Sequence, residues 1–514
     1  MSDIERIDSR VGRMALHGVA SLRAIEAAAQ AGLPPFTLMA RAGAAVARLA
    51  LAVAPHARRV VVFAGPGNNG GDGIEAAVRL HALAKPVHLV LVAAVDRLPT
   101  DAAQALHRAR SAGIELHLAA EGDAVARDGT GDDCDLVIDA LLGIGATRPP
   151  EGAIARAVEH IAGLAARGAR VLAVDVPTGL DSDFGRADGR VVVADDTLTL
   201  LALKPGLFTA AGRDHAGRIW LAPLAPRDDA VPDAWLVGRG DASWAPARRR
   251  HAEHKGSFGD VAVVGGAAGM AGAAWLAARA AHAAGAGRVF VDLLESNADG
   301  TPHTGDVDPL RPELMLRRGW WQGDVGVLRA ATVVCGCGGG APVRAALPRL
   351  LAHVARLVLD ADALNAIAAD PALQALVAAR RGRGLATVLT PHPLEAARLA
   401  GSDTAAVQGD RLGAARALAS RYGAVVVLKG SGTVIAAPDE LARIAATGNA
   451  SLASAGTGDV LAGWLGGRWA ASGADAFAVA TRAVIEHGAA AEPERPGALR
   501  AGDLVERLYL RARA

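Results

Sequence analysis

Short runs of β-branched and aliphatic residues alternate with Ala-, Leu- and Arg-rich stretches along the chain, and this alternation constrains the fold more than any other feature. An apolar run of four to six residues predicts a buried strand, and the longer stretch after it predicts a helix. Repeats of strand, helix and strand build parallel sheets that are covered by helices on both faces. The sequence therefore predicts an α/β protein.

The predicted strands fall into two series along the chain. This division agrees with the length of 514 residues, since a chain of this size rarely has one hydrophobic core. The first series has a helix predicted over Gly71–Ala84 and the strands Arg59–Ala64, Val87–Ala93, Cys134–Ile138 and Arg170–Val174. The second series has the strands Asp260–Val264, Arg288–Asp292, Ala331–Cys335, Arg356–Leu359, Thr387–Leu389 and Ala424–Leu428. Residues 222–250, between the two series, are rich in Pro, Asp and Arg without periodicity. We place a domain boundary there, near Asp241, which gives domains 1–240 and 241–514.

Charge and cysteine content argue against several classes of protein. The 54 Lys and Arg residues nearly cancel the 53 Asp and Glu residues, so a net charge of +1 offers no attraction for nucleic acid or an anionic membrane. Three cysteines make no disulfide framework, and we expect Cys134, Cys335 and Cys337 to be small buried hydrophobes. The N-terminus lacks a signal-peptide pattern, and no apolar run is long enough for a bilayer. We expect a soluble cytoplasmic protein.

A glycine-rich segment, Gly65–Gly73, follows the first predicted strand and opens the predicted helix. Its glycines at 65, 67 and 70 satisfy the dinucleotide pattern G-x-G-x-x-G, and a helix N-terminus there offers N–H groups to a phosphate. Asn68, Asn69 and Asp72 add oxygen atoms, which suggest a cation or a hydroxylated substrate. The same residues also suit a plain turn capped by Asn and Asp, and the segment alone leaves both interpretations open.

Two aspartates end predicted strands of the same series. Asp139 precedes Gly143, and Asp175 precedes the turn Pro177–Asp181. Ligands of open α/β sheets bind at the carboxyl ends of the strands, so this placement favours a site over two isolated turn residues.

Four motifs of the N-terminal half carry a family resemblance: Leu38–Gly43, Asn68–Asp72, Asp139–Gly143 and Asp175–Gly179. In this order, over roughly residues 7–223, they resemble the NAD(P)H-hydrate epimerase family, which implies a Rossmann-like three-layer fold. The resemblance implies a K⁺ ion held by Asn69, Asp139 and Thr178, whose oxygen atoms suit a hard cation. It implies substrate contacts from Asn68, Asn69, Gly70, Gly71, Asp72, Gly143, Ile144, Gly145, Ala146, Thr147 and Asp175.

The family's substrate carries a hydroxyl group on C6 of the reduced nicotinamide ring. Loss of this group leaves an iminium, and water that returns to the other face inverts the centre. An acid must help the oxygen to leave and a base must activate its return. Asp175 is the residue that we expect to perform this proton chemistry.

A second glycine turn, Gly456-Thr457-Gly458-Asp459, stands before an apolar helical run near the end of the chain. Such a turn can cradle the charge of a transferred phosphoryl group, and its Asp can take a proton from an attacking hydroxyl. Asp459 also suits a helix N-cap, and the motif alone leaves the two interpretations even. No Gly-x-x-x-x-Gly-Lys-Ser/Thr sequence is present, which argues against a P-loop kinase.

Six further motifs precede this turn: His254–Gly259, Gly265–Ala273, Pro312–Met315, Asp360–Asn365, Thr390–Pro393 and Lys429–Thr433. In this order, over about residues 250–508, they resemble the ADP-dependent NAD(P)H-hydrate dehydratase family, a branch of the ribokinase-like α/β fold. The resemblance implies that phosphorylation of the C6 hydroxyl by ADP, with Mg²⁺ present, makes it a good leaving group. This chain departs from the family pattern at two places: Leu394 stands where Gly is usual, and the glycine turn at 336–340 is looser than the usual one.

The resemblance assigns a role to each matching residue of this half. Asp459 deprotonates the hydroxyl, and the amides of Gly456 and Gly458 hold the phosphoryl group. The adenine nucleotide lies against Lys429, Gly430, Ser431, Gly432 and Thr433. The hydrated cofactor contacts Ala273, Gly338, His392 and Asp459.

Two other functions are consistent with parts of the sequence. One is a ribokinase-like small-molecule kinase with a non-catalytic Rossmann-like scaffold, and the other is a scaffold in RNA processing, which the near-zero charge argues against. Asp360 and Asp362 suit either a Mg²⁺ site or a strand end, and we leave them outside the catalytic set. We interpret His487 as a packing residue and expect the protein to form homo-oligomers.

Overall fold

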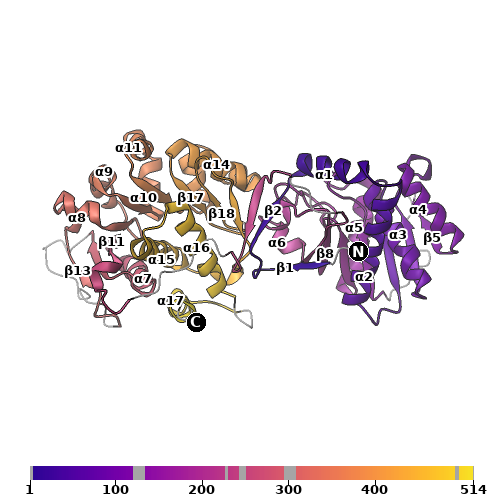
Figure 1. Cartoon of the computed structure of the whole chain (residues 1–514), viewed down its shortest axis with the longest axis horizontal. Helices are drawn as coiled ribbons and strands as arrows, with labels where there is room; N and C mark the ends of the chain where they lie inside the picture. The colour runs from indigo at the N-terminus through magenta and orange to yellow at the C-terminus, as the bar shows by residue number, and fades with distance from the viewer. Residues whose placement is uncertain are drawn as a thin grey trace. The chain divides into compact units, whose positions relative to one another are not determined.

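The computed structural model describes residues 4–119, 134–146, 148–225, 230–241, 250–294, 308, 310–492 and 497–512. The chain forms two compact units, whose helices and strands can be followed in Figure 1. The N-terminal unit contains residues up to Asp8 and Met14–Trp235. The C-terminal unit contains Ser9–Arg13 and the residues from Leu236 onward.

The N-terminal unit is built on an eight-stranded sheet with the order β1-β9-β8-β7-β6-β3-β4-β5. Its strands are β1 (Glu5–Ile7), β3 (Val60–Ala64), β4 (Val87–Leu91), β5 (Glu115–Leu118), β6 (Leu136–Ala140), β7 (Arg170–Val174), β8 (Asp196–Leu200) and β9 (Arg218–Ala222). Neighbouring strands run parallel, except that β1 pairs with β9 antiparallel. The four strands predicted for this half are therefore confirmed and lie next to one another in the sheet.

Helices cover both faces of this sheet. The helices are α1 (Val19–Ala31), α2 (Thr37–Val53), α3 (Asn68–Ala82), α4 (Thr100–Ser111), α5 (Gly152–Ala166), α6 (Gly212–His215), and the 3₁₀ turns η1 (Val95–Arg97) and η2 (Pro205–Leu207). Along β3, Val62 packs in the core with α2, α3 and α4, while Val61 and Phe63 pack in the core with α5. Because both of its faces are covered, β3 is a continuous apolar run and not an alternating one. This arrangement is the expected three-layer fold.

Helix α3 begins earlier than the sequence predicts. We expected it from Gly71, but it starts at Asn68, with Gly67 as N-cap, and ends at Ala82. The asparagines and Asp72 are thus part of the helix and not of a loop. The glycines are needed for close packing: a Cβ atom would lie 1.8 Å from the Leu141 carbonyl oxygen if built on Gly65, and 2.1 Å from the Gly65 oxygen if built on Gly70.

A second, larger sheet has the order β13-β12-β11-β14-β15-β16-β17-β18-β19-β10-β2. Its strands belong to the C-terminal unit except at β2 and β10, which contain the unit boundaries after Arg13 and after Trp235. Its strands are β2 (Arg13–Leu16), β10 (Ala234–Val237), β11 (Asp260–Gly265), β12 (Arg288–Leu293), β13 (Met315–Leu316), β14 (Thr332–Cys335), β15 (Arg356–Leu359), β16 (Ala386–Leu389), β17 (Val425–Leu428), β18 (Val434–Ala436) and β19 (Arg443–Ala445). Strands β11 to β17 pair in parallel, whereas β17, β18 and β19 pair antiparallel. The six predicted strands of this half are confirmed, and the antiparallel strands are additional.

Helices also pack on this sheet. They are α7 (Ala271–Ala283), α8 (Val325–Ala330), α9 (Val343–His353), α10 (Ala361–Ala368), α11 (Pro371–Gly382), α12 (Pro393–Ala400), α13 (Thr404–Gly409), α14 (Arg411–Tyr422), α15 (Thr457–Ser472), α16 (Ala476–Ala490), α17 (Ala501–Arg511), and the turns η3 (Lys255–Phe258), η4 (Trp320–Gln322) and η5 (Ala450–Leu452). Helix α15 is buried around most of its circumference, in one core with α7, α16 and α17. Its N-terminus is therefore held rigidly at the carboxyl ends of the strands. Among the helices of the described residues, none is both long and apolar enough to cross a bilayer.

The interpretation of the cysteines needs correction. All three are free, but only Cys335 and Cys337 are buried, and Cys134 is partly exposed because it stands just before β6. Cys337 is also more than a packing residue, because its thiol lies in the C-terminal site described below.

Candidate active sites

A cavity of about 440 Å³ opens in the N-terminal unit at the carboxyl ends of its strands. Eight of the predicted contact residues line it: Asn68, Asn69, Asp72, Gly143, Ile144, Gly145, Ala146 and Asp175. Gly70 and Gly71 are buried and do not line it, and Gly71 packs against Met39. Thr147 lies outside the described residues. The fold thus brings together the start of α3 and the segments that follow β6 and β7.

Asp139 and Thr178 form a buried pair next to this cavity. The Thr178 hydroxyl donates to Asp139 Oδ1 at 2.7 Å, and the Thr178 amide donates to Oδ2 at 2.8 Å. Burial raises the pKa of Asp139 to about 6, although these hydrogen bonds from Thr178 lower it. A cation beside this carboxylate would favour its charged form.

Asn69 supplies the observation that a cation fits here. Its Nδ2 atom is buried and has no hydrogen-bond partner among the described residues. An unpaired buried amide costs free energy, and the N and O atoms of an amide side chain are assigned by their hydrogen bonds. Rotation of the amide would place Oδ1 at this position, where it suits a hard cation as Asp139 and Thr178 do. The three residues that the family resemblance assigns to K⁺ are therefore compatible with it.

Asp175 lies at the cavity wall with a conformation that costs energy. It is 8% exposed, and its φ angle of +69° lies in the left-handed region that residues other than Gly rarely adopt. The Leu200 amide donates to Asp175 Oδ1 at 3.0 Å, and the Lys204 ammonium forms a buried ion pair with the same oxygen. The chain around β7 and β8 therefore fixes this carboxylate in one position.

Lys204 is the residue that sequence reasoning missed. It is 1% exposed, lines the cavity, and comes from the segment after β8. The available signal was a lysine directly after the apolar run 200–203, because a lysine in such a run is expected to be buried and a buried lysine needs a partner. Glu26 of α1, which also lines the cavity, had no comparable signal.

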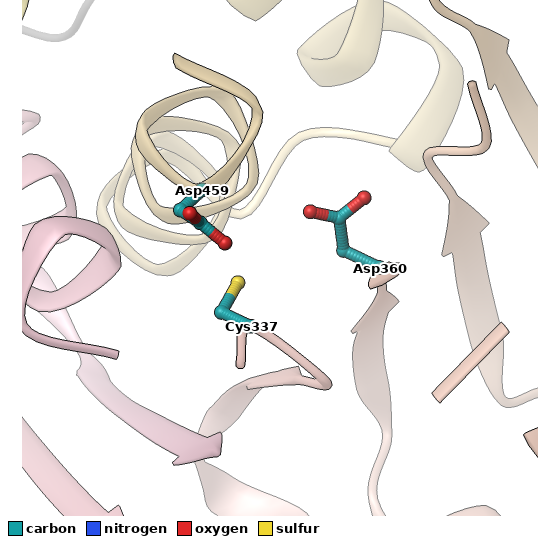
Figure 2. A group of neighbouring side chains, drawn as sticks. All are labelled: Cys337, Asp360 and Asp459. Carbon is teal, nitrogen blue, oxygen red and sulfur yellow. The ribbon is translucent and has the colours of Figure 1, made fainter. Parts of the chain in front are cut away.

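The C-terminal site surrounds the first turn of α15. Gly456 is the N-cap, with φ of +87°, so Asp459 lies in the first helical turn and is not the cap. The interpretation of Asp459 as a helix N-cap is therefore wrong. Figure 2 shows that Asp459 converges with Cys337, which follows β14, and with Asp360, which follows β15; ligand atoms of the three lie within 4.8 Å of one another.

The thiol and the carboxylates of this cluster differ in their ability to bind a metal ion, because their pKa values differ. Burial, together with Asp459 and Asp360, raises the pKa of Cys337 well above its ordinary value, so the thiol is protonated and donates to Asp459. Burial and the Asp360 charge raise the pKa of Asp459 to about 6. A protonated thiol is a poor metal ligand, whereas two carboxylates suit Mg²⁺.

Lys429 connects this cluster to the predicted nucleotide segment. Its ammonium donates to Asp360 Oδ1 at 2.7 Å, as the Thr390 hydroxyl does at 2.8 Å. Burial opposes its charge, but Asp360 and Glu395 raise the pKa of Lys429 above its ordinary value. A Cβ atom on Gly458 would lie 3.3 Å from the ammonium, so the charge lies beside the first turn of α15. The other segment residues, Gly430, Ser431, Gly432 and Thr433, connect β17 to β18.

The residues predicted to contact the hydrated cofactor are placed as follows. Gly338 adjoins Ala273, since its Cβ would lie 2.9 Å from that of Ala273, and it follows Cys337 directly. His392 caps α12: its Nδ1 accepts from the Leu394 amide at 3.1 Å, and its Nε2 lies 3.2 Å from Glu395 Oε1. Both ring nitrogens are thus engaged within the chain, which leaves the face of the half-exposed ring for a ligand.

His487 contacts the first turn of α15, whereas Trp320 and Trp321 line neither site. His487 is buried, its Nε2 lies 2.9 Å from the Thr457 carbonyl oxygen, and burial lowers its pKa to about 4. The interpretation as a packing residue is confirmed. Trp320 is 3% exposed and sits in a loop whose amides at Gly319 and Trp321 donate to Asp292.

Two known protein families match two separate parts of the chain. Residues 35–206 match the family described as YjeF-related protein N-terminus, and residues 261–505 match NAD(P)H-hydrate dehydratase. The bifunctional NAD(P)H-hydrate repair enzyme of Escherichia coli (strain K12) is 36% identical over 91% of this chain and 87% of its own length. The enzyme of the same name from Thermofilum pendens is 33% identical over 85% of this chain and 84% of its own.

Solved structures that resemble about half of this chain include a protein named after the second of these families. It is the ADP/ATP-dependent NAD(P)H-hydrate dehydratase from Bacillus subtilis, co-crystallised with ATP/Mg²⁺. It is 28% identical, covers 52% of this chain and 94% of its own, and superposes with a TM-score of 0.41.

Proposed function

The chain belongs to the family of bifunctional NAD(P)H-hydrate repair enzymes, and we propose that residues 1–240 carry the epimerase activity and residues 241–514 the ADP-dependent dehydratase activity. One observation carries the proposal: the two aspartates expected from motifs, Asp175 and Asp459, each line a site in a different unit, and neither is a helix cap. The substrates are the R and S forms of hydrated NADH or NADPH.

In the N-terminal unit, Asp175 performs the proton chemistry at C6 of the hydrated ring. The C6–O bond breaks as the oxygen takes up a proton and leaves as water, and the ring nitrogen stabilises the iminium. Water then adds to the other face and gives up a proton, so the two epimers interconvert without net consumption of protons. Asn69, Asp139 and Thr178 would hold K⁺, which supplies a fixed positive charge beside the substrate when bound.

In the C-terminal unit, Asp459 takes the proton from the C6 hydroxyl of the S epimer while the oxygen accepts the terminal phosphoryl group of ADP and AMP leaves. Phosphate then departs with the C6–O bonding electrons, and loss of a proton from C5 restores the C5=C6 double bond. Amides of the first turn of α15, at Gly456 and Gly458, together with the Lys429 ammonium, offer positive charge to the phosphoryl group. Asp360 would contribute a ligand to Mg²⁺, which neutralises phosphate charge when bound, and this leaves Asp459 available as the base.

The test follows the absorbance of restored NADH after the protein meets an R/S mixture of hydrated NADH with ADP and Mg²⁺. We expect complete conversion by the wild type and conversion of one epimer only, followed by the slow spontaneous rate, for Asp175→Asn. Asp459→Asn should restore no NADH while it still interconverts the epimers. A phosphorylated nicotinamide product that accumulates would instead identify a small-molecule kinase, and one-epimer conversion by the wild type would remove the epimerase assignment.

A further inference from the structure

Lys204 uses its whole hydrogen-bonding capacity inside the protein. Its ammonium donates to Asp175 Oδ1, to the Thr199 hydroxyl at 2.9 Å and to the Leu200 carbonyl oxygen at 2.7 Å. An ammonium has three protons, and these three acceptors take all of them. Lys204 lines the cavity but has no donor left for a ligand, so its influence on the chemistry must act through Asp175.

Asp175 lies within a group of like charges. The ionisable side chains that line the cavity are four carboxylates and two cations: Glu26, Asp72, Asp101 and Asp175, with Arg23 and Lys204. Neighbouring carboxylates in a partly buried site do not all ionise together, and the one with a paired cation ionises first. Of these carboxylates, Asp175 has the buried ion pair with Lys204.

The reaction proposed for this site needs two proton transfers of opposite direction. One group must give a proton to the oxygen that leaves from one face, and another must take a proton from water that adds to the opposite face. On the basis of the proposed function, we propose that Lys204 divides these transfers between two carboxylates: it positions Asp175 as the base and so leaves Asp72 as the acid.

The step balances with these two groups alone. Asp72 gives its proton to the C6 oxygen, the C6–O bond breaks, and water leaves with the bonding electrons while the ring nitrogen forms the iminium. A second water forms the new C6–O bond from the opposite face, and Asp175 takes its proton. Proton exchange with solvent restores both groups, and the reverse reaction exchanges their roles.

The charge distribution agrees with this division. Burial, and then the charges of Asp175 and Glu26, raise the pKa of Asp72 well above its ordinary value. Burial lowers the pKa of Lys204, and the Asp175 charge opposes this effect. Burial also raises the pKa of Glu26, but the rise is larger for Asp72, so Asp72 is the carboxylate most disposed to keep its proton. Asp175 is the carboxylate that the buried ion pair with Lys204 holds in position.

The experiment measures the pH profile of epimerisation between pH 5 and 9, with the R and S forms separated by chromatography and the spontaneous rate subtracted. Lys204→Met, Lys204→Arg and Asp72→Asn are compared with the wild type. Lys85→Met is the matched control, because within the part of the chain that the structure describes this lysine donates to the Pro55 and Ala57 carbonyl oxygens and does not line the cavity. Dehydration of the S form by the same chain reports the amount of active protein.

We expect a bell-shaped profile for the wild type and for Lys85→Met. Lys204→Met should move the ascending limb to higher pH, because the variant removes the cation that pairs with the base. Lys204→Arg, which keeps the charge, should restore much of the profile. Asp72→Asn should lose the descending limb, with kcat reduced about 100-fold or more, the usual contribution of a general acid.

Unchanged limbs in Lys204→Met, or a descending limb that persists in Asp72→Asn, would overturn the inference. If Lys204→Met does not fold, as circular dichroism would show, Asp72→Asn still decides it, since Asp72 is only partly buried and its replacement is isosteric. No acceleration above the spontaneous rate in the wild type would mean that the proposed function itself fails. Acceleration without these shifts would mean that only the role of Lys204 fails.

Discussion

Replacement of Asp459 by Asn tests whether this aspartate has a catalytic role or stabilises helix α15. A carboxylate that stabilised α15 would destabilise the protein when removed, as the loss of a helix cap does. The structure predicts the opposite, because Asp459 is not the cap and its charged form is disfavoured by burial and by Asp360. We therefore expect Asp459→Asn to abolish dehydration and yet to be more stable than the wild type at neutral pH.

The magnitude follows from the pKa. The folded protein raises the pKa of Asp459 from 3.8 to about 6. As the pH rises between these values, the unfolded chain loses this proton and the folded chain keeps it, so stability falls with rising pH. One pKa unit corresponds to about 1.4 kcal/mol, which gives a total loss of about 3 kcal/mol in the wild type, of which about 1.4 kcal/mol falls between pH 5 and pH 8. The Asn variant does not suffer this loss.

Urea unfolding at pH 5 and pH 8, followed by tryptophan fluorescence, measures this difference. Trp464 and Trp469 are buried on the same helix as Asp459 and report its unfolding. Asp439→Asn is a suitable control, because this carboxylate is 83% exposed and its positive φ angle is one that Asn tolerates. An Asp459→Asn variant that is less stable than the wild type at pH 8, or one that retains dehydratase turnover, would refute the reasoning.

Three further predictions concern other residues. Exchange of K⁺ for tetramethylammonium should slow epimerisation and spare dehydration, and Thr178→Val should slow epimerisation in K⁺; equal rates in both salts would contradict the cation site. Lys429→Met should lower kcat/KM for ADP at least tenfold, about 1.4 kcal/mol, in initial-rate measurements, because the ammonium beside Gly458 is lost. Arg380→Met should destabilise the protein by about 3 kcal/mol in urea unfolding, because the buried guanidinium donates to the Leu351, Val354 and Ala386 carbonyl oxygens; a shift below 1 kcal/mol would contradict this.

Local pattern was sufficient to predict ten of the strands and to single out the two aspartates that we propose as the reacting groups. Every parallel strand that we predicted from an apolar run is present, since a run buried on both faces has few other solutions. Asp175 and Asp459 were found because each ends a strand or begins a helix at a glycine turn, which is a property of neighbouring residues. Family resemblance, and not spacing, supplied the chemistry that they perform.

The tertiary structure decided what depends on residues far apart in the sequence. The segment Ser9–Arg13 belongs with the C-terminal unit because the Arg239 and Gly240 amides donate to the carbonyl oxygens of Ser9 and Val11, a pairing that no local pattern announces. The sequence predicts Cys337 to be a packing residue. Only the fold shows that its thiol forms a hydrogen bond with Asp459.

The sequence by itself determined the α/β class and the division into two series of strands, and it singled out the two aspartates that we propose as catalytic, because these follow from periodicity and from short motifs. Only the tertiary structure decided the electrostatic state of each site. Lys204 lies 29 residues from Asp175, and Lys429 lies 69 residues from Asp360, yet each lysine forms an ion pair with that aspartate. The charge that a carboxylate carries depends on its burial and on partners from separate strands. Neither can be predicted from the residues next to it in the sequence.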